Sequence, residues 1–338
     1  MTMRRILQVV VLLVCIAFAI APASAENCLT TGDMDAATKS AIESTARQFY
    51  GYTAAGDVSS LRMSAIPSLQ GNFGGIERSA LASKDALAGS QPNIYSTYML
   101  DATGGPATID RAMFMCGVYN SADRIQFSIP NLPAARYALV IMEANGQKGP
   151  YWLSLILQQM NGGQQMASGW KLAGFYPKRR RVGSNGPGWY LTHARDYRAK
   201  GEMHNAYFYY VTARDLALPV SFMITRPVEK LDSEAQPIVP RDLPGDSPMT
   251  LAAGGKNYQI TQIFPVQVGD GMNLVIKYKA LTDVNDARSS FANNMELIKA
   301  FAQRYPEYRT AFTGYVARAV DASTGADYGT VLNMSEVK

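Results

Sequence analysis

The stretch ARQFYGYTAAGDVSSL, residues 46–61, decides how the first half of the chain folds. Phe49 and Tyr50 of this stretch follow Ile42 by seven and eight residues, and this spacing puts the three side chains on one face of a helix. Gly56 suits the left-handed residue that ends a helix, and the aspartate that follows suits the cap of the next one. The stretch therefore predicts a long helix, a glycine stop and a short second helix.

Strand-like segments follow this helical start. After a further helix over residues 84–88, alternating or continuous apolar runs predict strands at residues 94–100, 111–119, 124–129, 136–144, 152–160 and 170–176. The last two strands flank Asn161-Gly162-Gly163, which is a turn signal for a hairpin. Helices followed by a meander predict an α+β unit with the helices packed in the concavity of the sheet.

This order resembles the NTF2-like domains, which are cystatin-like α+β cones. Residues 46–61 are similar to the first helix, turn and second helix of that family, and GWKLAGF at 169–175 is similar to its final strand. The resemblance covers residues 33–177 and implies a cone with an interior cavity. Enzymes of the superfamily place an acid, a histidine or a tyrosine in that cavity.

The first unit, residues 26–177, contains no histidine, so a site in the cone would depend on acids and tyrosines. The candidate cavity residues are Tyr50, Tyr95, Tyr98, Asp101 and Glu143, with Asp110 as a further acid. A carboxylate in an apolar cone has its pKa raised and can act as a base. The alternative is that the acids face solvent at strand ends while the tyrosine rings fill the core. The second interpretation is favoured.

The first 25 residues have the pattern of a secretory signal peptide. Arg4 and Arg5 precede an apolar run over residues 6–20, and Ala23-Ser24-Ala25 forms a small-residue cleavage site. The run is shorter than the roughly 20 residues of a membrane-spanning helix. The sequence therefore predicts a periplasmic or secreted protein with no transmembrane segment after cleavage.

Composition excludes several classes of protein. With 47% hydrophobic and 17% charged residues in 338, the chain is not disordered throughout, and without a short strict repeat it is neither collagen-like nor a coiled coil. The net charge of +5 includes two arginines in residues 1–25, where no acid occurs, so 30 basic and 27 acidic residues remain and give +3. Basicity therefore carries little functional information, and nucleic acid is not an expected partner.

The chain has three cysteines, of which Cys15 lies in the predicted signal peptide. The other two, Cys28 and Cys116, predict one disulfide in an oxidising compartment. A count of two carries little pattern information, so a buried free Cys116 beside an exposed Cys28 is the alternative.

A basic run opens the predicted linker of residues 178–188. Lys178, Arg179, Arg180 and Arg181 could contact phosphate, acidic lipid or anionic glycan, and Gly-rich residues follow them. Four cations fall below the block size typical of an interaction tail, so a solvated domain edge is the favoured interpretation.

Residues 189–219 resemble a single tetratricopeptide-like helix hairpin. Alanines and tyrosines carry the resemblance, at Ala194, Tyr197, Ala206, Tyr210 and Ala213, with Gly201 at the turn. A third helix over residues 222–235 is expected to cap the hairpin within a helical segment of residues 189–236. Such hairpins most often contact protein, and the candidate contact residues are Trp189, Tyr197, Tyr207 and Tyr210. The two histidines of the chain, His193 and His204, do not form a metal motif.

Four prolines within residues 237–250 predict an extended linker before a C-terminal unit of residues 251–338. Strands at 258–268 and 273–280, a helix near 287–301, and strands at 314–320 and 328–332 predict a ββαββ unit that belongs to no family we recognise. One helix covers one face of such a sheet and leaves the other face open.

No catalytic signature fixes a reaction, since the chain contains no G-x-S-x-G, H-E-x-x-H or phosphate-loop pattern. We therefore expect an exported, non-catalytic protein that binds a protein partner or an envelope component through its helical and C-terminal segments. The alternative is a small-molecule-binding protein, or a lyase or isomerase, that uses the cone cavity. No cofactor or metal is expected.

Overall fold

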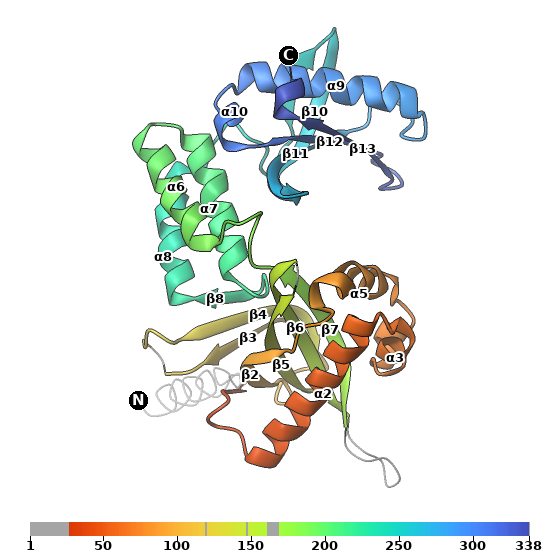
Figure 1. The fold of residues 1–338 in the computed structure, drawn as a ribbon, viewed down its shortest axis with the longest axis vertical. Helices are drawn as coiled ribbons and strands as arrows, with labels where there is room; N and C mark the ends of the chain where they lie inside the picture. The colour runs from red at the N-terminus through yellow and green to blue at the C-terminus, as the bar shows by residue number, and fades with distance from the viewer. Residues whose placement is uncertain (1–26, 119, 147, 161–168, 338) are drawn as a thin grey trace, which may run out of the picture.

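The computed structural model describes residues 27–118, 120–146, 148–160 and 169–337. The predicted signal peptide and the turn at 161–163 lie outside the described residues. The fold is α+β, as predicted. Figure 1 shows three parts, which we call the N-terminal unit (residues 27–181), the helical segment (residues 187–238) and the C-terminal unit (residues 249–337).

The N-terminal unit begins with a short strand and four helices. They are β1 (Asn27–Leu29), α2 (Ala36–Ala55), α3 (Val58–Met63), α4 (Pro67–Gln70) and α5 (Gly74–Leu87). The Asp35 side chain caps α2, and Gly56 ends it with a φ of 75°. Asp57 then caps α3 by accepting a hydrogen bond from the Ser60 amide. The helix, stop and second helix expected from residues 46–61 are therefore present.

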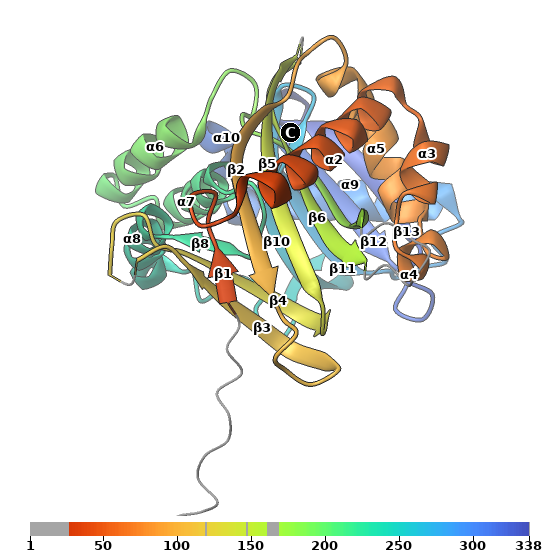
Figure 2. The ribbon, with the colours of Figure 1, turned by 90° about the horizontal axis from the view of Figure 1, so that it is seen from below.

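A five-stranded antiparallel sheet forms the centre of this unit. It contains β1 together with β2 (Asn93–Asp101), β5 (Arg136–Gly146), β6 (Gly149–Met160) and β7 (Gly169–Arg179), in the order β1-β2-β5-β6-β7. Figure 2 shows α2 lying across these strands. Ile42, Phe49 and Tyr50 of α2 pack with Leu153 and Leu155 of β6 in one core.

A second, three-stranded sheet covers the other face of the first. It contains β3 (Thr108–Cys116), β4 (Ile125–Pro133) and β8 (Met223–Thr225), in the order β3-β4-β8. Phe114 and Phe127 of this sheet pack with Leu139 and Ile141 of β5. The expectation of one continuous meander is therefore wrong, because β3 and β4 leave the first sheet and pack on its back.

The helical segment contains two packed helices and a third, shorter one. It consists of α6 (Pro187–Ala199), α7 (Met203–Ala217), α8 (Arg226–Ala235) and a 3-10 turn at Gln236–Ile238. Gly201, with a φ of 81°, lies in the tight connection between α6 and α7. The capping helix begins at Arg226 rather than at 222, because residues 223–225 pair with β4 as strand β8.

The C-terminal unit is a five-stranded sheet with helices on one face. It contains β9 (Met249–Ala253), β10 (Lys256–Val268), β11 (Gly271–Lys279), α9 (Ala287–Arg304), α10 (Tyr308–Ala311), β12 (Gly314–Val320) and β13 (Asp327–Asn333), followed by a 3-10 turn at Met334–Glu336. The order is β13-β12-β11-β10-β9, with β11 and β12 parallel. The predicted ββαββ unit lacks β9, whose first residues fall in the predicted linker.

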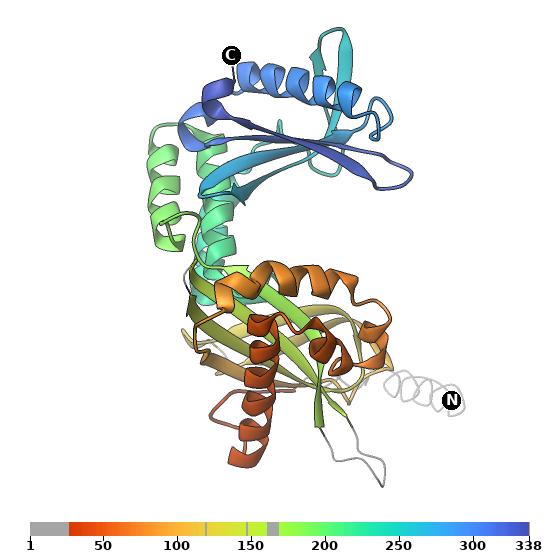
Figure 3. The ribbon, with the colours of Figure 1, turned by 45° about the vertical axis from the view of Figure 1, so that its right-hand side comes forward.

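The helical segment shares its core with the C-terminal unit. Tyr190 of α6 and Phe208 of α7 belong to the same buried cluster as Leu274 and Phe301 of the C-terminal unit. Val228 of α8 instead packs into the core between the two N-terminal sheets. The helical segment therefore bridges the two units, as Figures 1 and 3 show, and has no separate core of its own.

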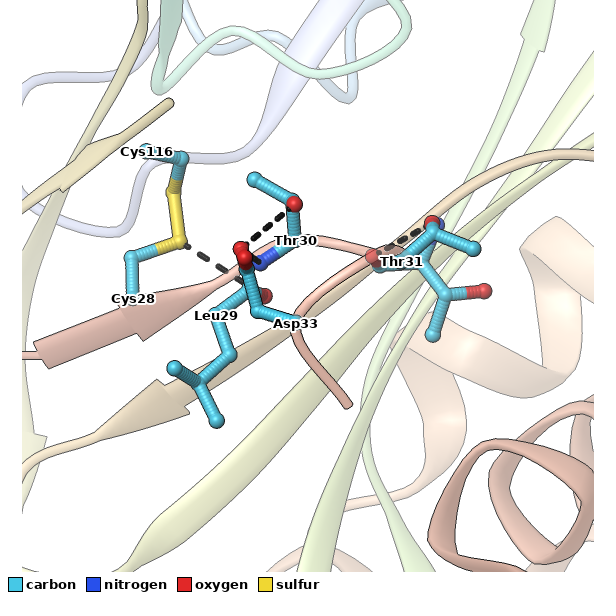
Figure 4. Close-up of a disulfide and its surroundings, with 7 residues drawn as sticks. Cys28, Leu29, Thr30, Thr31, Asp33 and Cys116 are labelled. Atoms are coloured by element: carbon cyan, nitrogen blue, oxygen red, sulfur yellow. Dashed lines mark hydrogen bonds between the residues drawn. A yellow bond between two sulfur atoms is a disulfide. The ribbon is translucent and has the colours of Figure 1, made fainter. Parts of the chain in front are cut away.

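Cys28 and Cys116 form a disulfide, with their Cα atoms 5.2 Å apart. Figure 4 shows the bond running from β1 to the end of β3. It therefore links the two N-terminal sheets at the start of the described chain. The disulfide expected from the cysteine count is confirmed.

Candidate functional site

The structure does not bring the five predicted cavity residues together. Tyr50 lies on the helix side of the first sheet, where its hydroxyl donates to the Leu87 carbonyl at 2.9 Å. Tyr98 lies on the opposite side, between the two sheets. The two tyrosines cannot line one cavity, because a fully packed sheet separates them.

The two acids among these residues are engaged by arginines. Arg136 pairs with Asp101 at 3.0 Å, and Arg180 pairs with Glu143 at 2.6 Å. Burial acts to raise the pKa of Asp101, but hydrogen bonds from Thr103 and Arg136 outweigh it and hold the pKa below its ordinary value. A carboxyl group needs a raised pKa to act as the predicted base, and the pKa of Asp101 is lowered instead. The predicted acid–base site is therefore not assembled.

Tyr95 and Glu143 belong to one cluster at an end of the first sheet, where Trp152 and Arg180 connect them. The Tyr95 ring packs edge-on against Trp152 with centroids 5.0 Å apart, and the Arg180 guanidinium lies 4.1 Å from the centroid of that Trp152 ring. Because Arg180 also pairs with Glu143, the four side chains hold one another, and the cluster is a structural contact.

The two histidines take up separate positions. His193 stacks on Trp189 with ring centroids 3.7 Å apart. His204 lies between Asp242, 2.9 Å from its Nε2 atom, and Glu307, 3.0 Å from its Nδ1 atom. These carboxylates contact opposite sides of the ring. Across the described ranges, no cluster of three or more potential ligands could hold a metal ion.

The predicted protein-contact residues differ in exposure. Trp189 is exposed, while Tyr197 and Tyr207 are half-buried against the shared core. Tyr210 is fully buried and donates a hydrogen bond to Glu234 at 3.0 Å. Tyr210 is therefore a core residue and not a contact residue, because the side of α7 on which it lies packs inside the segment.

The basic run is divided between structure and surface. Lys178 and Arg179 are the last residues of β7 and not part of a linker. Lys178 donates to the Asp215 carbonyl at 2.6 Å and to the Leu218 carbonyl at 3.1 Å, and pairs with the Asp215 carboxylate. Arg180 is held by Glu143. The side chains of Arg179 and Arg181 are exposed, and neither has a hydrogen-bond or ion-pair partner among the described residues.

Arg179 and Arg181 border a cleft where the three parts of the molecule meet. This junction cleft has a volume of about 650 Å³. Its walls are the end of β7 with the residues up to Val182, the C-terminal half of α7, and the hairpin of β10 and β11. The apolar part of the lining includes Val182, Val211, Leu216, Phe264, Val266 and Met272.

The path of β10 explains why the cleft is open. Within the described sheet, β9 pairs only with residues 256–260 of β10. Residues 261–268 of β10 therefore have no neighbouring strand on the side away from β11. Phe264 and Val266 point to one face of the sheet and Pro265 to the other, yet all three line the cleft. The cleft therefore wraps around a free strand edge.

The face of the C-terminal sheet opposite α9 is open and apolar. Val266, Val268 and Val331 on this face are 36%, 37% and 52% exposed. With Phe264, Val275 and Val316 they line a shallow hollow of about 390 Å³, which shares Phe264 and Val266 with the junction cleft. Figure 3 shows that this face is turned towards the N-terminal unit.

The cleft is not predicted by the sequence, although two of its walls are. The basic run of residues 178–181 and the strand that contains residues 263–268 can both be recognised in the sequence. That they lie side by side cannot be predicted, because β7 and β10 are about eighty residues apart in the chain and are brought together by the packing of the helical segment.

Comparisons with known proteins identify no family for this chain. No protein-family model matches it, and neither a curated protein nor a solved structure matches it. Within the described part of the chain, no helix is both long and apolar enough to cross a membrane. The assignment of function therefore depends on the junction cleft and the open sheet face.

Proposed function

We propose that this chain is an exported, non-catalytic protein of the cell envelope that binds a partner protein through its helical and C-terminal segments. The observation that carries the proposal is the open face of the C-terminal sheet. Val268 and Val331 are exposed there beside Val316, although Tyr315 and Leu332 on the opposite face of β12 and β13 are buried in the core that α9 shares. A continuous apolar face with a polar border is typical of a protein interaction surface.

Charge at the border of this face defines the partner further. The cation of Lys277 lies on this face, 5.3 Å from the Phe264 ring centroid. The acid on the face, Asp327, is already paired with Arg318. The complementary surface is therefore apolar with acidic residues around it, and that is the partner we propose.

Export is supported by two independent features. The sequence pattern of residues 1–25 predicts a signal peptide. The disulfide between Cys28 and Cys116 is compatible with the periplasm or the extracellular space, where disulfides persist.

We also propose that the N-terminal unit is NTF2-like and that α6 and α7 form a tetratricopeptide-like hairpin. Support for the first comes from α2 and α5 packing on one face of an antiparallel sheet after a glycine stop at Gly56. Support for the second comes from the packing of α6 against α7 and from the small Ala194, Ala206 and Ala213, all of which are fully buried. Neither likeness carries a function by itself.

Site-specific crosslinking tests the binding surface. A photoreactive amino acid placed at Val331 should crosslink one acidic partner protein in an envelope extract, and the same residue at Val118 should not. Both valines are exposed, but Val118 lies on the N-terminal unit, away from the sheet face.

A double variant that introduces two acids on the sheet face tests the same surface in a second way. Val268→Asp with Val331→Asp should abolish the crosslink and the capture of that partner, because it places acids against an acidic surface. The control, Val118→Asp with Val239→Asp, changes two exposed valines that line neither the sheet face nor the junction cleft, and it should leave capture intact. Equal crosslinking from positions 331 and 118, or capture that survives the face variant, would refute the proposed surface.

A further inference from the structure

We propose that the junction cleft binds an anionic amphiphile, that is, a single alkyl chain with a carboxylate or phosphate head. The alkyl chain would lie along Val211, Leu216 and Met272, and the head would contact Arg179 and Arg181. This ligand goes beyond the partner protein proposed above, which would occupy the neighbouring sheet face. A cleft of about 650 Å³ lies within the range of roughly 300 to 1,000 Å³ typical of small-molecule sites.

The polar side chains of the cleft wall are mostly engaged within the protein. Thr212 donates to the Phe208 carbonyl at 2.9 Å, and Gln267 donates to the Gly269 carbonyl at 2.8 Å. Lys178 and Asp215 pair with each other. A ligand with many polar groups, such as a peptide backbone, would lose hydrogen bonds to water without finding replacements here. An alkyl chain carries no such cost.

The free edge of β10 is also poorly suited to a peptide strand. The two-residue turn Gly269-Asp270 joins β10 to β11, and Val268 and Gly271 form the closing pair. Along an antiparallel hairpin, residue pairs that are hydrogen-bonded to each other alternate with pairs that are not. Counted from the closing pair, Pro265 and Leu274 are a pair without hydrogen bonds between them. The backbone of Pro265 therefore faces outwards, into the cleft. Proline has no N–H to donate, so the centre of this edge cannot form a regular ladder with an added strand.

The two arginines give the cleft its preference for a negative head group. Both border the cleft, and neither is neutralised by an acid among the described residues. An arginine guanidinium binds carboxylate or phosphate through paired hydrogen bonds. The one carboxylate in the cleft lining, that of Asp215, is held by Lys178.

Direct binding of defined probes tests the inference. Titration calorimetry of the exported chain with sodium laurate below its micelle concentration should give one site per chain. Dodecanol and dodecyltrimethylammonium, which share the chain but lack the negative head, should bind about tenfold more weakly, because the charge-assisted hydrogen bonds are absent. Acetate and inorganic phosphate, which lack the chain, should show no measurable binding.

Two variants assign the binding to the cleft. Arg179→Gln with Arg181→Gln should weaken laurate binding about tenfold and leave dodecanol binding within about twofold of wild type. Val211→Glu should weaken both probes, since it places a carboxylate on the alkyl wall. The matched control, Arg111→Gln with Arg241→Gln, removes two exposed arginines outside the cleft and should change nothing.

Single-chain phospholipids distinguish the source of the head group. If the ligand is a free fatty acid, laurate binds and lysophosphatidylglycerol does not compete with it. If it is a single-chain phospholipid, lysophosphatidylglycerol competes and lysophosphatidylcholine, whose head carries no net charge, does not. Either result supports an anionic amphiphile.

The inference is overturned if laurate does not bind, if it binds no better than dodecanol, or if the double glutamine variant binds it as wild type does. An acidic peptide that displaces laurate and loses affinity in the same variant would also overturn it in favour of a peptide ligand. The partner-protein proposal stands or falls separately, because Val268→Asp with Val331→Asp should leave laurate binding unchanged.

Discussion

Tyr210 joins a buried ring to a charged network. Its ring is fully buried in α7, and its hydroxyl donates to Glu234 of α8, which also receives hydrogen bonds from Arg195 at 2.9 and 2.7 Å. The Glu234 carboxylate of α8 therefore connects α8 to α6 through Arg195 and to α7 through Tyr210. The contribution of the ring can be separated from that of the hydroxyl by substitution.

We expect Tyr210→Phe to lower the free energy of unfolding by about 1 to 2 kcal/mol, because it removes one hydrogen bond to a carboxylate. Tyr210→Ala should lower it by about 3 to 5 kcal/mol, because it also empties the space of the ring. Denaturant unfolding followed by circular dichroism measures both. Equal values for the two variants would show that the ring contributes nothing, contrary to its burial.

Glu234 should make stability depend on acid pH. Hydrogen bonds from Arg195 above all, and from Tyr210, hold its pKa below the ordinary value of 4.5. A carboxyl with a lowered folded-state pKa stabilises fully above its unfolded-state value, and this stabilisation is lost as the pH falls through the folded-state pKa. The unfolding free energies of wild type and Glu234→Gln should therefore differ most near neutral pH and converge under acid.

The control for this pH series is Asp246→Asn, which changes an exposed acid with no partner among the described residues. Its unfolding free energy should follow that of wild type across the whole pH range. A gap between wild type and Glu234→Gln that stays constant to low pH would contradict the assigned role of the ion pair.

At the scale of elements, the disulfide fastens the first strand to the second sheet. β1 is the edge strand of the first sheet and pairs with β2 over three residues, and its Cys28 is bonded to Cys116 of β3, 88 residues away. A three-residue edge strand gains little from pairing alone, so the covalent link holds it in place.

Replacing both cysteines with serine should lower the free energy of unfolding by about 3 to 5 kcal/mol, the range expected for a closed loop of this length. Denaturant unfolding of the oxidised wild type and of the variant gives the difference. Thiol titration of the unreduced, unfolded protein after removal of residues 1–25 should find no free thiol. Two free thiols per chain would mean that the bond does not form in the exported protein.

At the scale of the whole molecule, Lys178 joins the N-terminal unit to the helical segment. It extends from the end of β7 to the last carbonyls of α7, where a cation is also favoured by the helix dipole. This contact closes one side of the junction cleft, so the shape of the cleft depends on it.

Lys178→Ala should speed hydrogen exchange at the C-terminal end of α7, near residues 215–218, and in the first turn after β7. Hydrogen exchange with mass spectrometry measures this locally. Lys230→Ala, which removes an exposed lysine of α8, should leave both segments unchanged. Unchanged exchange in Lys178→Ala would show that the two parts are held together without this residue.

The local pattern of the sequence was enough to predict most elements. The glycine stop at Gly56, the helix hairpin around Gly201 and the strand pairs on either side of the short turns were expected, because caps, turns and apolar periodicity act over a few residues. The α+β class and the disulfide followed from the same information.

Only the tertiary structure decided which elements meet. β3 and β4 left the first sheet, residues 223–225 joined them across about a hundred residues, and the predicted cavity residues separated onto opposite faces. The pairing of distant strands depends on how whole faces bury one another, and no short segment contains that information. For the same reason the sequence determined that residues 178–181 are basic, but the packing of β7, α7 and β10 decided that two of these cations border an apolar cleft.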